Sequence, residues 1–131
     1  MHFSVFDIAG SAMRAQSLRL NTTASNLANA SSIAGSADEA YRSRHPVFAA
    51  ALDDAVGSVR TLGVVESDRP AERRYEPGHP MADDDGYIYA SNVDTIEEMT
   101  NMMSASQSYQ SNIELLNTAR QLMLKTLKLG E

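Results

Sequence analysis

The acidic stretch around residue 83 is the part of the sequence whose residue types and spacing come nearest to a metal site. Asp83, Asp85 and Gly86 match positions 3, 5 and 6 of a calcium-binding loop. In that alignment position 1 is Met81 and position 12 is Asn92, so two carboxylate ligands are missing. We therefore interpret this stretch as a solvated acidic turn and not as a calcium site.

The other residues that could act in catalysis or metal binding are scattered along the chain. His2, His45 and His79 lack the spacing of metal ligands. On a helix, Glu97 and Glu98 would point to different faces, so they are not expected to act as an acid/base pair. In the first turn of a helix, their carboxylates would instead interact with the positive end of the helix dipole. The chain has no Cys, and it contains no phosphate loop, nucleophile elbow or dinucleotide fingerprint. We expect no enzyme, no cofactor and no metal.

Composition also narrows the class of partner. The 131 residues carry a net charge of −6 and 6% aromatic residues without Trp, which disfavours nucleic acid and anionic membranes. No run of about 18 apolar residues is present, so we expect no direct membrane insertion. The first residues have no cationic segment, and Asp7 interrupts the apolar run, so we expect no cleaved signal peptide.

The charges are concentrated in the middle of the chain. Residues 38–98 hold 14 acidic and 6 basic side chains, whereas Arg19 is the only charge in 15–37 and Glu114 the only one in 99–119. Amides and hydroxyls are buried readily if they find hydrogen-bond partners, but lone charges are costly to bury. We interpret both ends as segments surrounded by protein. Composition bias in an Ala/Ser-rich chain is the alternative.

Large apolar residues recur every seven positions near the N-terminus and predict a helix over residues 4–32. Most residues three and four positions after each of them are small, which is typical of a close, coiled-coil-like seam between helices. Gly35 is the expected stop. The row consists of Phe6, Met13, Leu20 and Leu27.

The C-terminal part repeats this design and predicts a helix over residues 95–129. Asp94 or Thr95 is the expected N-cap, and Thr95 with Glu98 fits a capping box. One row is Met102, Tyr109, Leu116 and Met123, which Met99, Ile113 and Leu127 widen; a second row is Leu115, Leu122 and Leu129. A single helical hairpin leaves the second row uncovered, so we predict packing between chains.

The intervening residues 33–92 contain all four Pro residues and read as loops and short strands. Strands are expected within 41–48, over 58–66 with a bulge at Gly63, and around 73–75 and 87–89. The predicted fold is mainly α with a small β part. The two terminal helices pair as a coiled-coil-like bundle, and a short antiparallel hairpin or meander lies between them, within one domain covering 1–131.

Three separated motifs resemble the family of flagellar basal-body rod and hook proteins. Ser25-Asn-Leu-Ala-Asn29 resembles the centre of the N-terminal motif, and Met103-Ser-Ala-Ser-Gln-Ser-Tyr-Gln-Ser-Asn-Ile113 resembles the C-terminal half. Between them, Tyr75-Glu-Pro-Gly-His-Pro80 and Asn92-Val-Asp94 are similar to the short proximal-rod members. The motifs occur in the family's order over nearly the whole chain. Ser91 departs from the usual Pro, which affects the local turn geometry.

The resemblance implies a structural subunit of the proximal rod in the bacterial flagellar basal body. Such a subunit assembles into the drive shaft that transmits torque and encloses the export channel. The implied location is the periplasmic rod, reached through the flagellar type III export apparatus. The implied partners are copies of the same chain and the other rod proteins FlgB, FlgF, FlgG and FliE.

The expected helix-packing interface combines the apolar rows with polar residues of the motifs. The Asn residues offer amide hydrogen bonds that fix the register between buried helices. The expected residues are Phe6, Met13, Leu20, Ser25, Asn26, Leu27, Asn29, Met102, Tyr109, Ile113, Leu116, Asn117 and Met123. Two alternatives stay open: another flagellar axial protein of rod or hook type, and a cytoplasmic helix-binding adaptor or export chaperone.

Overall fold

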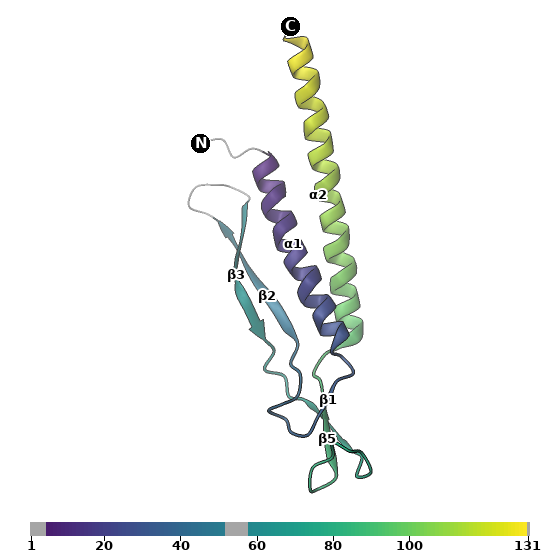
Figure 1. Ribbon diagram of the computed structural model, residues 1–131. Helices are drawn as coiled ribbons and strands as arrows, with labels where there is room; N and C mark the ends of the chain where they lie inside the picture. Colours follow the sequence, from purple (N-terminus) through teal and green to yellow (C-terminus); the bar gives the residue numbers. More distant parts are fainter. Residues whose placement is uncertain (1–4, 52–57, 131) are drawn as a thin grey trace.

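Two long antiparallel helices lie side by side, and a β-rich segment joins them at one end (Figure 1). The computed structural model describes residues 5–51 and 58–130. Helix α1 (Val5–Ala28) has 24 residues and α2 (Thr95–Leu129) has 35, so close to half of the 131-residue chain is helical. The predicted pairing of the two terminal helices is therefore confirmed.

Helix α2 covers the range expected from the sequence, but its N-terminal capping differs. The Asp94 carboxylate accepts hydrogen bonds from the backbone N–H groups of Ile96 (3.1 Å) and Glu97 (3.2 Å), so Asp94 is the N-cap. The predicted capping box of Thr95 and Glu98 is wrong, because the Glu98 side chain turns into the protein and is only 2% exposed.

Helix α1 ends at Ala28, four residues before the predicted end, and the stop at Gly35 is wrong. Both the backbone N–H and the side-chain amide of Asn29 donate to the carbonyl of Ser25, at 3.1 and 2.8 Å. The Ser32 hydroxyl then donates to the carbonyl of Asn29 at 2.8 Å. These local bonds close the chain into a turn where another helical turn was expected.

The β-rich segment forms two sheets, whereas the sequence predicted one short hairpin or meander. Strands β2 (Arg44–Ala51) and β3 (Ser58–Glu66) pair as an antiparallel hairpin. Strands β1 (Ile33–Ala34), β5 (Tyr87–Ala90) and β4 (Glu72–Tyr75) form a second antiparallel sheet with β5 in the middle. Figure 1 shows the β2–β3 hairpin beside α1, while the β1–β5–β4 sheet extends beyond the helices. The two-residue strand β1 was not predicted.

The predicted bulge in the β2–β3 hairpin is confirmed. Val47 pairs with Gly63 and Phe48 pairs with Thr61, which leaves Leu62 as the additional residue on β3. Gly63 has a φ of 152°. A glycine accommodates this backbone conformation without the steric cost of a Cβ atom.

The acidic turn between β4 and β5 is held together by one of its own carboxylates. Asp83 accepts hydrogen bonds from the backbone N–H groups of Tyr87 (2.8 Å) and Asp85 (3.0 Å) and from the Tyr89 hydroxyl (3.1 Å). The Tyr87 N–H is the main reason why the pKa of Asp83 lies below its ordinary value. Asp83 therefore stabilises the turn, in keeping with the interpretation of this stretch as an acidic turn.

The fully buried side chains of the two helices are mainly small. The buried residues of the helices are Ala9, Ser11, Ala15, Thr23 and Asn26 on α1 and Glu98 and Ala105 on α2. Small residues let the helices approach closely but bury little apolar area. In the described part of the chain, Ile88 is the one large apolar side chain among the most deeply buried residues. Most of the large apolar side chains therefore remain at or near the surface.

Candidate assembly interface

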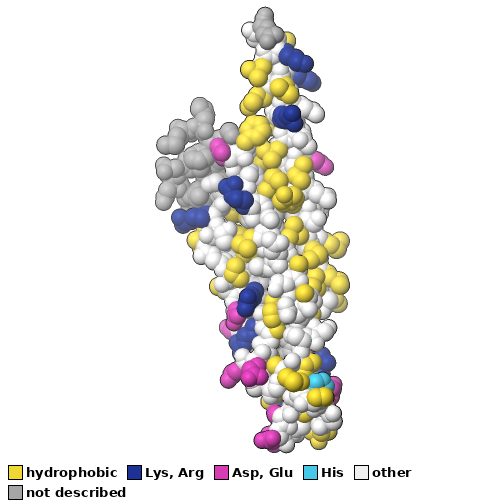
Figure 2. Space-filling view, viewed as in Figure 1, with side chains coloured by type: hydrophobic (Ala, Val, Ile, Leu, Met, Phe, Trp, Pro, Cys, Tyr) yellow, Lys and Arg dark blue, Asp and Glu magenta, His cyan; other side chains and the backbone are white. Residues whose placement is uncertain are grey.

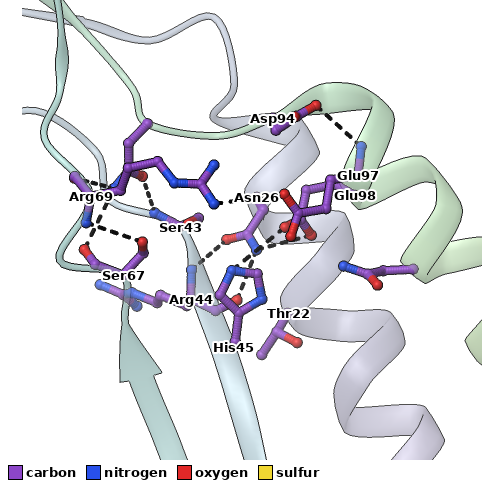
Figure 3. Close-up of polar contacts among 12 residues, drawn as sticks. Thr22, Asn26, Ser43, Arg44, His45, Ser67, Arg69, Asp94, Glu97 and Glu98 are labelled. Atoms are coloured by element: carbon purple, nitrogen blue, oxygen red, sulfur yellow. Dashed lines mark hydrogen bonds and ion pairs between the residues drawn. The ribbon is translucent and has the colours of Figure 1, made fainter.

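A junction of buried polar groups joins α1, β2 and α2. The Asn26 side chain on α1 is 0% exposed. Its Oδ1 accepts hydrogen bonds from the Arg44 backbone N–H and the Tyr41 hydroxyl, both at 2.9 Å. Its Nδ2 donates to the Arg44 carbonyl (2.8 Å) and to Glu98 Oε2 (3.2 Å). Figure 3 shows Asn26 between Arg44 and Glu98. The amide thus uses its full hydrogen-bonding capacity within the chain.

The buried carboxylate of Glu98 also lies close to a histidine. Glu98 Oε1 is 3.7 Å from His45 Nε2, and the His45 side chain is 38% exposed. Glu98 lies in the first turn of α2, where the helix dipole favours a negative charge. Sequence reasoning assigned Glu98 to this dipole but missed its partners Asn26 and His45.

A second asparagine, Asn92, holds the same stretch of chain from another direction. Its Oδ1 accepts the Ser43 backbone N–H at 2.7 Å, and its Nδ2 donates to the Arg69 carbonyl at 2.7 Å. The Asn92 backbone N–H donates to the Tyr41 carbonyl at 3.4 Å. We call residues 41–45 the strap, because Asn26 and Asn92 both bind this segment. The strap fixes how the β2–β3 hairpin leaves the helix pair.

The apolar row of α2 continues past the beginning of α1. Arg19 on α1 donates to Asn101 on α2 at 3.1 Å, so the antiparallel helices are level at these residues. Val5 lies 14 residues before Arg19 and is therefore level with about residue 115 of α2. Every residue from 120 to 130 is exposed. This C-terminal part of α2, residues 119–130, is called the overhang below.

The residues expected at the helix-packing interface differ in how far they are buried within the single chain. Half-buried along the helix pair are Phe6, Met13, Leu20 and Leu27 of α1 and Met102, Tyr109 and Leu116 of α2. Met123 is 52% exposed, because it lies in the overhang. Ser25, Ile113 and Asn117 are exposed, Asn29 is half-buried, and Asn26 is in the interior. All these residues except Asn26 therefore have surface available for another chain.

Exposed apolar side chains lie along the whole of α2. Figure 2 shows hydrophobic side chains spread over the length of the molecule. The second predicted row becomes more exposed towards the C-terminus, from 46% at Leu115 to 60% at Leu122 and 88% at Leu129. The first turns of α2 add Ile96, Met99 and Met103. Apolar surface of this extent marks a site of protein–protein contact.

No other kind of site emerges from the described residues. Within 5–51 and 58–130, no group of three His, Cys, Asp or Glu side chains is arranged to bind a metal ion. None of the helices over the same residues has both the length and the apolar character needed to cross a membrane. The exposed face of α2 and the junction beneath it are thus the candidate functional surfaces.

Comparisons with known proteins give one consistent result. Residues 6–32 match the family "Flagella basal body rod protein", and residues 84–129 match "Flagellar basal body rod FlgEFG protein C-terminal". The chain is 54% identical to the flagellar basal-body rod protein FlgC of Salmonella typhimurium and 53% identical to that of Escherichia coli O6:H1, each over 98% of this chain and 97% of the relative. It is 42% identical to FlgC of Buchnera aphidicola from Acyrthosiphon pisum, with the same coverage.

Proposed function

The chain belongs to the FlgC family of flagellar basal-body rod proteins, and from this premise we propose that it is a proximal-rod subunit which transmits torque. As a member of a structural family it is a component of the basal-body rod and not an enzyme. Its activity is association with other subunits. The two terminal helices carry out that association.

The observation that carries this proposal is the exposed apolar surface of α2. Large apolar side chains such as Ile96 (77% exposed), Met103 (74%) and Leu127 (64%) have no cover within the described chain. Each side chain of this size contributes about 1.5–3 kcal/mol when it is fully buried. Neighbouring subunits that cover α2 would therefore supply much of the stability that the chain's own small-residue core lacks.

In the proposed rod the two helices of each subunit pack as a coiled-coil-like bundle against those of its neighbours. The half-buried row of α1 and the rows of α2 supply the apolar contacts, and Ser25, Asn29 and Asn117 supply polar contacts that select the register. Asn26 contributes indirectly, because its hydrogen bonds orient α1 and α2 relative to the strap. The charged middle of the chain then contacts adjacent subunits at larger radius.

The subunit also has a proposed location in the flagellum and proposed neighbours. The bundle of helices surrounds the export channel within the periplasmic part of the rod. The subunit reaches this place through the flagellar type III export apparatus without cleavage of a signal peptide. Its neighbours are further copies of the chain and the rod proteins FlgB, FlgF, FlgG and FliE.

Mass spectrometry of purified hook–basal bodies, combined with deletion of the gene, tests the proposal. We expect the chain in the basal bodies, and a deletion strain that is non-motile and lacks rods. Re-expression of the intact chain should restore both rods and motility. A chain found solely in the cytosol, with normal rods in the deletion strain, would favour a helix-binding adaptor or export chaperone and overturn the proposal.

A further inference from the structure

Three of the seven methionines of the chain lie close together at the start of α2. Met99 is 54% exposed and Met103 is 74% exposed, whereas Met102 is half-buried. Residues four positions apart on a helix are neighbours on one face, so the side chains of Met99 and Met103 lie next to each other on the surface of α2. We call Met99 and Met103 the methionine pair.

The methionine pair lies in an apolar and uncharged part of the α2 surface. Ile96 precedes Met99 by three positions, lies on the same face and is 77% exposed. Residues 99–113 contain no Asp, Glu, Lys or Arg. A neighbouring subunit that covers this face would therefore bury thioether and hydrocarbon groups together, without an ion pair to residues 99–113.

The thioether of methionine is apolar but can be oxidised, and exposure makes it accessible to an oxidant. With hydrogen peroxide, a sulfur lone pair attacks one oxygen, the O–O bond breaks, and the second oxygen leaves as water. The sulfur is oxidised to a sulfoxide, and the peroxide is reduced. The product is polar, and methionine sulfoxide reductases convert it back to the thioether with electrons from a thiol. The modification therefore changes the polarity of the surface reversibly.

We propose that the methionine pair is an oxidation site that decides whether a free subunit can enter the rod. In the free chain both side chains are open to a peroxide, which converts them to sulfoxides. In the rod a neighbouring subunit would have to bury the new S–O groups, and burial of a polar group without a hydrogen-bond partner is costly. The inference rests on the proposed function, because it takes the exposed face of α2 as an assembly surface.

Peptide mapping by mass spectrometry tests whether assembly covers the methionine pair. The purified chain and purified basal bodies are treated with the same dilute hydrogen peroxide. We expect sulfoxides at both residues in the purified chain and oxidation about tenfold slower in basal bodies, where neighbouring subunits exclude the oxidant. Equal rates in the two samples would overturn the proposal, because the methionine pair would then be uncovered in the rod.

Two double variants separate the polarity of these side chains from their size. Met99→Gln with Met103→Gln places polar groups of similar length where the sulfoxides form. Met99→Leu with Met103→Leu keeps the surface apolar and removes the oxidisable sulfur. We expect the Gln strain to lack rods and motility and the Leu strain to retain both. Normal rods in the Gln strain, or loss of rods in the Leu strain, would overturn the proposal.

Met81→Gln is the matched control, because Met81 is 45% exposed but lies in the turn between β4 and β5, away from α2. This strain should be motile. Far-UV circular dichroism of the purified variants checks their folding. Gln and Leu are good helix formers at surface positions, so the helical content should match that of the unmodified chain. If the double Gln variant loses helix, Met103→Gln alone takes its place.

The same experiments separate this inference from the proposed function. If the unmodified chain is present in basal bodies but its methionine pair is oxidised as fast as in the free chain, the oxidation site is refuted and the rod assignment is kept. Absence of the unmodified chain from basal bodies would instead remove the proposed function itself.

Discussion

Asn26 on α1 donates a hydrogen bond to the carboxylate of Glu98 on α2 across 3.2 Å, and both side chains are buried. The two residues lie 72 positions apart in the chain. This contact links α1 to α2 together with the hydrogen bond from Arg19 to Asn101 (3.1 Å), and the bonds between Asn26 and Arg44 attach β2 to the same point. The junction therefore sets the relative position of the helices, which the apolar surfaces alone leave open.

Replacing Asn26 should destabilise the free subunit strongly. In Asn26→Ala the backbone groups of Arg44 and the buried Glu98 carboxylate lose partners, so we expect a loss of about 2–4 kcal/mol in the free energy of unfolding. Asn112→Ala on α2 is the control, because Asn112 donates only to the Ser108 carbonyl within its own helix. Urea unfolding followed by circular dichroism measures both variants. Equal losses would show that Asn26 has no special role.

The N-cap of α2 can be tested by changing two adjacent residues. Asp94→Ala should cost about 1 kcal/mol of stability, because two backbone N–H groups lose their acceptor. Thr95→Ala should change stability by less than about 0.5 kcal/mol, as is usual for exposed positions away from caps. Thermal unfolding of both variants distinguishes the two residues. A larger effect at Thr95 would revive the capping box with Glu98.

Two glycines of the turn between β4 and β5 should respond differently to substitution by alanine. Gly86 has a φ of 86°, and a Cβ atom there would lie 2.9 Å from the Tyr75 ring and 3.0 Å from the Pro77 Cβ. We expect Gly86→Ala to cost about 1–3 kcal/mol. At Gly78 no atom lies within 4 Å of the added Cβ, so Gly78→Ala is the control. Chemical denaturation should show a clear loss of stability for the first variant only.

The turn around Asp83 should weaken in acid. Its pKa is lowered in the folded protein, so the stabilisation is present above the pKa of the unfolded chain and is lost as the pH falls through the folded value. The protection of the Tyr87 amide against exchange, measured relative to an unstructured peptide at the same pH, should therefore fall below about pH 4, where free Asp side chains titrate. Asp83→Asn should remove most of this pH dependence. An unchanged profile in this variant would assign the effect to other groups.

Assembly should be sensitive to a charge placed on the helix surface. Leu116 is half-buried on α2, and Leu116→Asp leaves the chain soluble because the residue still reaches solvent. In a rod, however, the new carboxylate would be enclosed by neighbouring subunits at a cost of several kcal/mol. We expect loss of motility and of rods in basal-body preparations. Leu20→Asp on α1 should behave alike, and normal motility of both strains would refute the interface.

The sequence correctly predicted those helices and strands whose ends are set by residues nearby in the chain. Helix α2 and strand β3 match the expected ranges because periodicity, caps and β-branched residues act over a few positions. The end of α1 was missed because the side chains of Asn29 and Ser32 compete for backbone groups there. The rod motif Ser25-Asn-Leu-Ala-Asn29 pointed to the correct region for Asn26. Its partners, however, lie 15, 18 and 72 residues away and follow from no local pattern.

The strap has a mechanical consequence for the attachment of the β2–β3 hairpin. Asn26 and Asn92 bind the strap through separate bonds to Tyr41, Ser43 and Arg44. Because these bonds hold neighbouring residues of one short segment, we expect a pull on the β2–β3 hairpin to act on several of them together. Attachments loaded in parallel yield together at a higher force than attachments that peel apart in succession. The attachment of the hairpin to the helix pair thus does not depend on any single hydrogen bond.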